Sequence, residues 1–130
     1  MTDLPSLIAA VEAASGPDRE IDAMVAVHLG MIDEREAAIG FRLDKSGETK
    51  MVISPKVSRF TASIDAVVAL IRREMPGVEW SLHGGGETSF VFFEPDERPE
   101  HEPDEAPTEA LALLLAFLRA VQAKQMETTP

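Results

Sequence analysis

The sequence predicts a mixed α/β (α+β) fold with the element order ααββαββα. Apolar residues recur at helical spacing in the first thirty residues and over 64–75, whereas 39–54 and 78–93 alternate apolar and polar residues as strands do. The segment Ala110–Leu118 is apolar on every side, so a helix there needs neighbours on more than one face. We therefore expect one antiparallel or mixed four-stranded sheet with helices packed on both faces.

The first thirty residues are expected to form a helical hairpin. Asp3 is placed to cap the first helix, whose apolar residues fall at i, i+3, i+4 and i+7: Leu4, Leu7, Ile8 and Val11. Ser15-Gly16-Pro17 ends that helix, and the acidic residues Asp18 and Glu20 suit the positive end of the next one. Gly30 is expected to stop the second helix.

Two strand pairs and two further helices complete the expected layout. Residues 39–43 and 49–54 read as strands joined by the turn Asp44-Lys45-Ser46-Gly47, and the alternation predicts one buried face. A third helix follows, with Thr61 or Ser63 as its cap. Strands at 78–83 and 88–93 are joined by three glycines, and Thr108 is expected to cap a last helix that runs to about Lys124.

The chain of 130 residues has room for one domain, 1–130, with one core. The segment 94–107 has four prolines, seven acidic residues and no aliphatic side chain larger than alanine, which predicts an acidic, proline-rich mobile loop. Residues 125–130 are expected to fray.

Composition excludes several classes of function. The chain lacks cysteine, which removes disulfides and thiolate chemistry and fits a reducing cytoplasm. Its first residues carry no basic, apolar leader, and its longest apolar run is about half of a membrane span. We therefore expect a cytoplasmic protein without membrane contact. The net charge of −11 makes nucleic acid a poor partner for the chain as a whole.

No residue pattern predicts catalysis. The glycines after His83 join two strands instead of opening a helix, so they do not form a phosphate loop. None of the three histidines, His28, His83 and His101, has a nucleophile or a paired carboxylate at a spacing typical of a catalytic site. We expect a protein that is not an enzyme, with no cofactor and no metal site.

Three stretches of the chain match the pattern of a known family. Leu7–Ala23 is similar to L…LE.A.GPDRELDA, and Ser58–Ala66 with Trp80-Ser81 is similar to PRYTASLDAA…W.WS. Ala106–Leu113 is similar to A.TPALAL, although Pro107-Thr108 reverses the usual order. The chain thus resembles small phage and prophage proteins that carry the phage ABA sandwich domain. The resemblance implies a sheet between helices and a gene of phage origin, and it implies no activity or catalytic residue.

Charged residues are the candidate contacts for a partner. A basic group surrounds the third helix, and acidic residues fill the proline-rich segment: Lys56, Arg59, Arg72 and Arg73, and Asp96, Glu97, Glu100, Glu102, Asp104 and Glu105. The apolar last helix is a candidate surface for a homodimer. The leading hypothesis is a non-enzymatic accessory protein of phage or prophage origin that acts through protein–protein contacts. The alternative is an acidic inhibitor that mimics nucleic acid and blocks a host DNA-binding protein.

Overall fold

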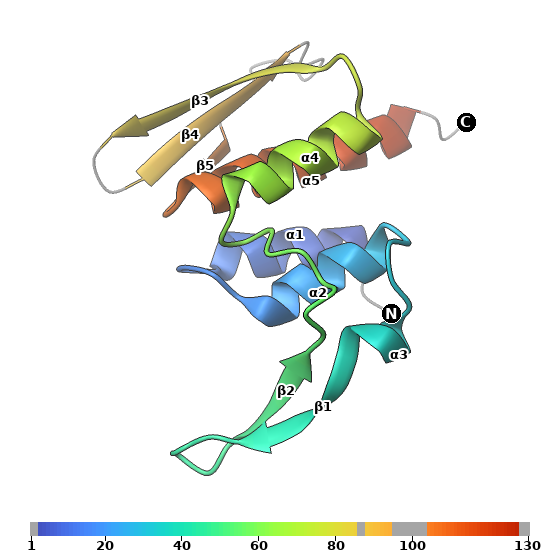
Figure 1. The fold of residues 1–130 in the computed structure, drawn as a ribbon. Helices are drawn as coiled ribbons and strands as arrows, with labels where there is room; N and C mark the ends of the chain where they lie inside the picture. The colour runs from blue at the N-terminus through green and yellow to red at the C-terminus, as the bar shows by residue number, and fades with distance from the viewer. Residues whose placement is uncertain (1–2, 86–87, 95–103, 128–130) are drawn as a thin grey trace.

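Four layers follow one another in the computed structural model, which describes residues 3–85, 88–94 and 104–127 (Figure 1). A three-stranded sheet lies at one end, two layers of helices lie in the middle, and a β-hairpin protrudes at the other end. The elements are α1 (Leu4–Ala13), α2 (Arg19–His28), α3 (Glu34–Ala37), β1 (Ala38–Leu43), β2 (Thr49–Ile53), α4 (Ile64–Glu74), β3 (Glu79–Gly85), β4 (Thr88–Glu94), β5 (Asp104–Ala106) and α5 (Glu109–Glu127).

Side-chain caps set the starts of the N-terminal helices, as predicted for Asp3, whereas Asp18 was expected only to favour the helix dipole. The carboxylate of Asp3 accepts from the Ser6 N–H at 2.9 Å, and that of Asp18 accepts from the Glu20 N–H at 2.9 Å. Of the two candidate caps of α4, Ser63 is the one used, through the Ala66 N–H at 3.2 Å. The four-residue helix α3 was not predicted, because its only local signal is the cap at Asp33.

The described strands form two antiparallel sheets, β1-β2 and β3-β4-β5, so the prediction of one four-stranded sheet is wrong. The helices α4 and α5 lie between the two hairpins and keep their edges apart (Figure 1). The third strand of the larger sheet, β5, falls within the predicted loop 94–107. Its three residues bond to the edge of β4, which needs backbone groups and not large apolar side chains. Residues 95–103 lie outside the described part.

Helix α5 is the centre of the core. Every residue from Ala110 to Leu118 is at most 5% exposed, because β4 and β5 cover one side of the helix and α1 and α4 cover the other. The expected homodimer surface on this helix is therefore wrong for 110–118, since its apolar residues are already buried within one chain. The helix continues to Glu127, within the segment that was expected to fray.

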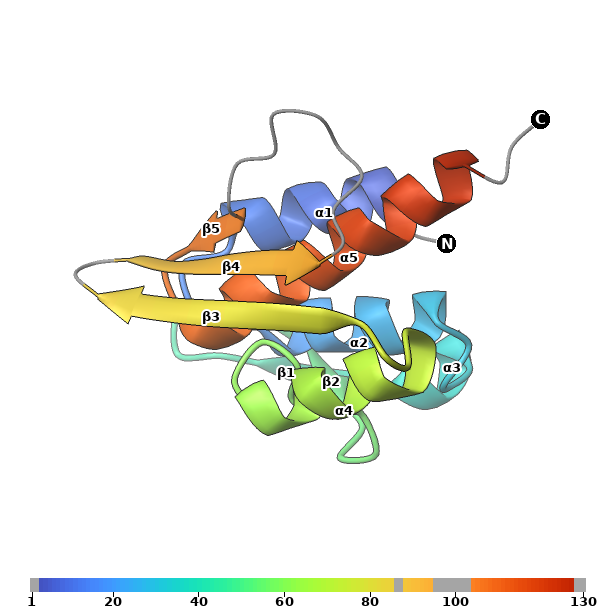
Figure 2. The same cartoon turned by 90° about the horizontal axis from the view of Figure 1, so that it is seen from above.

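The larger sheet has α4 and α5 on one face, and none of the described helices lies on its other face (Figure 2). We expected helices on both faces of the sheet, and the described residues place them on one face only. Val91 in the middle strand is fully buried against the helices, and Trp80 on β3 is half-buried beside it. The side chains of Phe90, Phe92 and Phe93 lie outside the described part. No described helix has the length and hydropathy to cross a bilayer.

Candidate functional site

Among the described residues, the large apolar side chains with the highest exposed fractions lie on the β1–β2 hairpin. Ile39, Phe41 and Leu43 leave 60%, 70% and 72% of their surface in solvent. Their alternation predicts a buried face, and within one chain that face has no cover. A large exposed apolar group that lies on one element marks a contact surface more often than scattered single residues do.

The strand register places Phe41, Leu43 and Met51 on one face of the hairpin, whereas Ile39 lies in a bulge and has no cross-strand partner. Phe41 pairs directly with Met51, and Leu43 pairs with Thr49, so these side chains share a face. Arg42 pairs with Lys50 on the opposite face. The hairpin is therefore amphipathic, with one apolar and one basic face.

A groove of about 270 Å³ begins where the apolar face of the hairpin meets α2 and α3. Met51 belongs to both the hairpin face and the groove wall. The rest of the wall comes from the two helices and the start of β1: Glu20, Ala23, Met24, Val27, His28, Glu34, Ala37 and Ala38. The face and the groove form one continuous surface, which we name the apolar strip: Ala23, Met24, Val27, Met51, Phe41 and Leu43.

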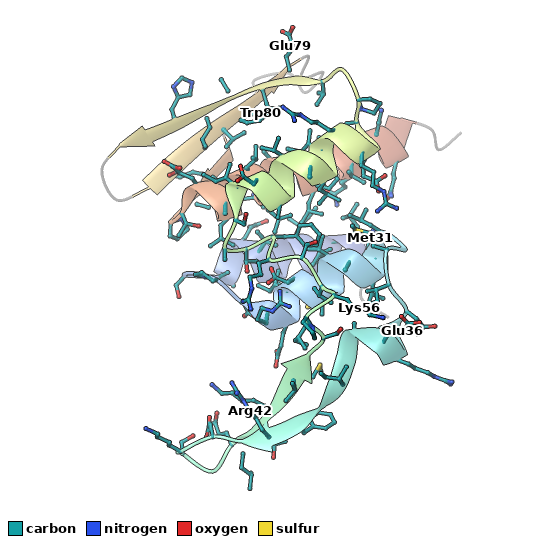
Figure 3. All side chains as sticks on the ribbon, viewed as in Figure 1. Met31, Glu36, Arg42, Lys56, Glu79 and Trp80 are labelled. Atoms are coloured by element: carbon teal, nitrogen blue, oxygen red, sulfur yellow. The ribbon has the colours of Figure 1, made fainter. Side chains whose placement is uncertain are left out.

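The two ends of the apolar strip differ in charge. The exposed acids Glu20 and Glu34 stand at the groove, whereas Arg42 and Lys45 stand on the protruding hairpin. Figure 3 shows Arg42 on the hairpin, well away from the helices. Neither of these two cations is within 4 Å of a carboxylate among the described residues. The groove end of the strip is thus acidic, and Lys45 adds a cation at the hairpin tip, where Glu48 and the Asp44–Lys50 ion pair also lie.

The tip of the hairpin is ordered by Asp44. Its carboxylate accepts from the Ser46 hydroxyl and from the N–H groups of Ser46 and Glu48, at 2.9 and 3.0 Å. The hydrogen bond from the Ser46 hydroxyl is the main cause that holds the pKa of Asp44 below its ordinary value of 3.8. Gly47 takes a φ of +86°, which favours glycine, and so closes the turn.

A buried polar clamp ties the hairpin base to the helices. The Asp22 side chain is 1% exposed and accepts from Arg19 Nη1 at 2.9 Å, from the Thr61 N–H at 2.8 Å and from the Thr61 hydroxyl at 2.8 Å. Arg19 Nη2 also donates to the carbonyl oxygens of Ser54 and Val57, at 3.0 and 2.9 Å. A buried carboxylate is tolerated when it is paired and hydrogen-bonded in this way.

The clamp is structural. Its carboxylate oxygens are taken up by Arg19 and Thr61, and none of its residues lines the groove. It joins the two stretches that carry the family resemblance, since Arg19 and Asp22 belong to the first and Thr61 to the second. These residues therefore hold α2 against the chain that leaves β2, and the hairpin is anchored at the same point by the Ser54 N–H, which donates to the Ala37 carbonyl at 2.8 Å.

The predicted basic contacts do not form one group. Lys56 and Arg59 are exposed in the connection from β2 to α4, and Figure 3 shows Lys56 beside the end of β2. Arg72 and Arg73 are exposed in the last turn of α4, where cations suit the helix dipole. The helix between them is about 16 Å long, so the four cations lie at two ends of it.

Most of the predicted acidic contact residues lie outside the part of the chain that the structure describes. Asp96, Glu97, Glu100 and Glu102 lie outside the described residues. Asp104 and Glu105 lie in β5, where Glu105 is exposed at the edge of the sheet. Within the described ranges, no group of three or more histidine, aspartate or glutamate side chains could hold a metal ion. His28 is half-buried at the groove, and His83 is exposed on β3 beside Ser81.

A comparison of the chain with known protein families, with curated proteins and with solved structures finds no match in any of the three. The resemblance to the phage ABA sandwich domain therefore stays a prediction.

Sequence reasoning missed the apolar strip, although its signal is present. The alternation of Ile39, Phe41 and Leu43 predicts the inner face of a sheet. A short amphipathic hairpin with cations on its other face, and with no third strand next to it in sequence, is also typical of an arm that contacts another surface.

Proposed function

We propose that the protein acts through protein–protein contacts and that the β1–β2 hairpin, with the groove at its base, is the contacting element. The observation that carries this proposal is the 70% and 72% exposure of Phe41 and Leu43 on a protruding hairpin. A two-stranded hairpin is only marginally stable by itself in water. A partner that covers its apolar face would supply the missing support.

The biological setting is part of the same proposal. The resemblance described above supports an accessory protein of phage or prophage origin, located in the cytoplasm of a bacterial host and without enzymatic activity. The apolar strip adds a physical basis for contact that the charge pattern alone did not give. It favours the contact hypothesis over nucleic-acid mimicry, because mimicry requires acidic groups at the contacting surface and the face that carries Phe41, Leu43 and Met51 is apolar.

Capture from a bacterial lysate that also contains an untagged copy of the chain tests the proposal. The baits are the wild type, the variant Phe41→Glu/Leu43→Glu, and the control Ala9→Glu/Ala69→Glu. Both variants add two negative charges at exposed positions, but only the first alters the apolar strip. We expect the wild type and the control to capture the same proteins and the hairpin variant to lose them.

Salt separates the alternatives in the same experiment. Contacts through apolar side chains persist as salt rises, whereas a mimic of nucleic acid releases basic, nucleic-acid-binding partners. Equal capture by all three baits, or capture of nothing by the wild type, would contradict the hairpin as contacting element.

A further inference from the structure

We infer that the occupant of the apolar strip is the strip of a second copy of this chain, packed about a two-fold axis so that each hairpin enters the other copy's groove. This inference rests on the proposed function and names its partner. It is argued from the shape of the strip, from its charges and from its area.

The strip is self-complementary in shape. Its outer end is a protrusion that carries Phe41 and Leu43, and its inner end is a groove lined by Ala23, Met24, Val27 and Met51. A two-fold axis across the strip reverses its direction, so the protrusion of each copy meets the groove of the other. An apolar cavity of about 150 Å³ accommodates a benzene ring. The groove, at about 270 Å³, therefore has room for the Phe41 ring.

The charges are complementary in the same arrangement. Reversal of the strip brings Lys45, at the hairpin tip of one copy, toward Glu20 and Glu34 of the other, whereas Arg42 lies on the face that is turned away. Lys45 is at the tip of the hairpin, so it would reach furthest along the partner's groove. Each dimer contains this pairing twice. A strip packed in the parallel sense would instead place like charges together, which disfavours that alternative.

The area is sufficient for a weak but specific dimer. Phe41, Leu43 and Met51, at 39–72% exposure, present on the order of 400 Å² per copy before the groove walls are counted. Two copies with their groove walls would bury about 1,000 Å² in total, the lower limit for specific interfaces. Interfaces at this lower limit are typical of weak, transient complexes, so we expect a dissociation constant no tighter than about micromolar.

Sedimentation equilibrium of the purified full chain measures the dimer directly. We expect a monomer–dimer equilibrium for the wild type and the control Ala9→Glu/Ala69→Glu, and a dissociation constant weakened roughly 100-fold in Phe41→Glu/Leu43→Glu. Circular dichroism melting checks that this variant is folded, which its exposed positions favour. A wild type that stays monomeric to millimolar concentration overturns the second-copy inference and leaves the lysate capture to decide the proposed function. A dimer that the hairpin variant does not weaken also overturns the inference.

Charge exchange tests the reciprocal packing. Lys45→Glu and Glu20→Lys/Glu34→Lys should each weaken the dimer roughly tenfold, and the variant that combines all three changes should restore it. Glu20→Lys/Glu34→Lys, the groove variant, gives the more decisive test. It makes the chain less negative by four units, so reduced general repulsion would tighten the dimer, whereas loss of complementary pairs weakens it. Tighter association of the groove variant overturns the reciprocal arrangement.

The absence of cysteine allows a direct check of which residues meet. A mixture of Leu43→Cys and Met24→Cys chains, treated with a short bismaleimide, should cross-link mainly between the two variants. Each chain then has a single thiol, so every cross-link joins two copies. Predominant cross-linking of Leu43→Cys to itself would show hairpins packed face to face and would overturn insertion into the groove.

Discussion

The buried carboxylate of Asp22 on α2 accepts two hydrogen bonds of 2.8 Å from Thr61, which lies 39 residues further along the chain. The Thr61 hydroxyl also accepts from the Asp18 N–H at 2.8 Å. One threonine thus ties the first turn of α2 to the connection that leads into α4. Because Arg19 completes the clamp from the other side, the base of the hairpin is fixed relative to the helices, and the apolar strip gains a rigid support.

Removal of the Thr61 hydroxyl should destabilise the protein. Thr61→Val keeps the shape of the side chain but leaves a buried lone pair of Asp22 and the Asp18 N–H without this partner, at a cost of about 2 kcal/mol in the free energy of unfolding. Urea denaturation measures it. Thr61→Ser retains the hydroxyl and loses one methyl group, so it should cost about 1 kcal/mol or less. Equal losses in the two variants would show that the hydroxyl does not stabilise the clamp.

Replacement of Arg19 by lysine should also be costly, although the charge is kept. The guanidinium of Arg19 donates at once to Asp22, Ser54 and Val57, and a lysine ammonium cannot span that fork. We expect Arg19→Lys to lower the free energy of unfolding by about 2 kcal/mol. The control is Arg35→Lys on the exposed face of α3, with an expected change within about 0.5 kcal/mol. Denaturation curves of similar midpoint for both variants would contradict the role of the fork.

The clamp also shows where sequence reasoning ends. The caps Asp3 and Ser63 were predictable because a cap and its partner lie three residues apart. Thr61 has the same local signal as Ser63, yet its partners are on α2. A long-range hydrogen bond leaves no spacing in the sequence by which it could be recognised.

The two hairpins illustrate the same limit for strands. Alternation correctly predicts each of them and the turn at Asp44–Gly47, because these depend on adjacent residues. Whether the hairpins join depends on where α4 and α5 lie, which local patterns do not contain. For the same reason the alternation of Phe41 and Leu43 shows that one face is apolar, and only the fold shows that this face has no cover within the chain.

The hairpin tip should respond to acid. The folded pKa of Asp44 is lowered below 3.8, chiefly by the hydrogen bond from the Ser46 hydroxyl, so the turn is stabilised above the pKa of the unfolded chain, about 3.9. That stabilisation is lost as the pH falls through the lower folded value. Carboxyl ¹³C shifts in an NMR titration should place the midpoint of Asp44 below 3.8. Ser46→Ala should raise it toward the ordinary value, and an unchanged midpoint in that variant would contradict the assignment of the cause.

Shorter side chains at buried positions of α5 should lower stability without changing association, which distinguishes the core from the contact surface. Leu114 is fully buried, so Leu114→Ala should lower the free energy of unfolding by about 3 kcal/mol through the cavity that it leaves. The half-buried Val121 is the control, and Val121→Ala should cost about 1 kcal/mol. If the dimer forms through the hairpins, neither change should alter its dissociation constant in sedimentation experiments on the folded chains. Weaker association of Leu114→Ala, under conditions where it is fully folded, would return the interface to α5, and the exposed face of Phe41 and Leu43 would then need another explanation.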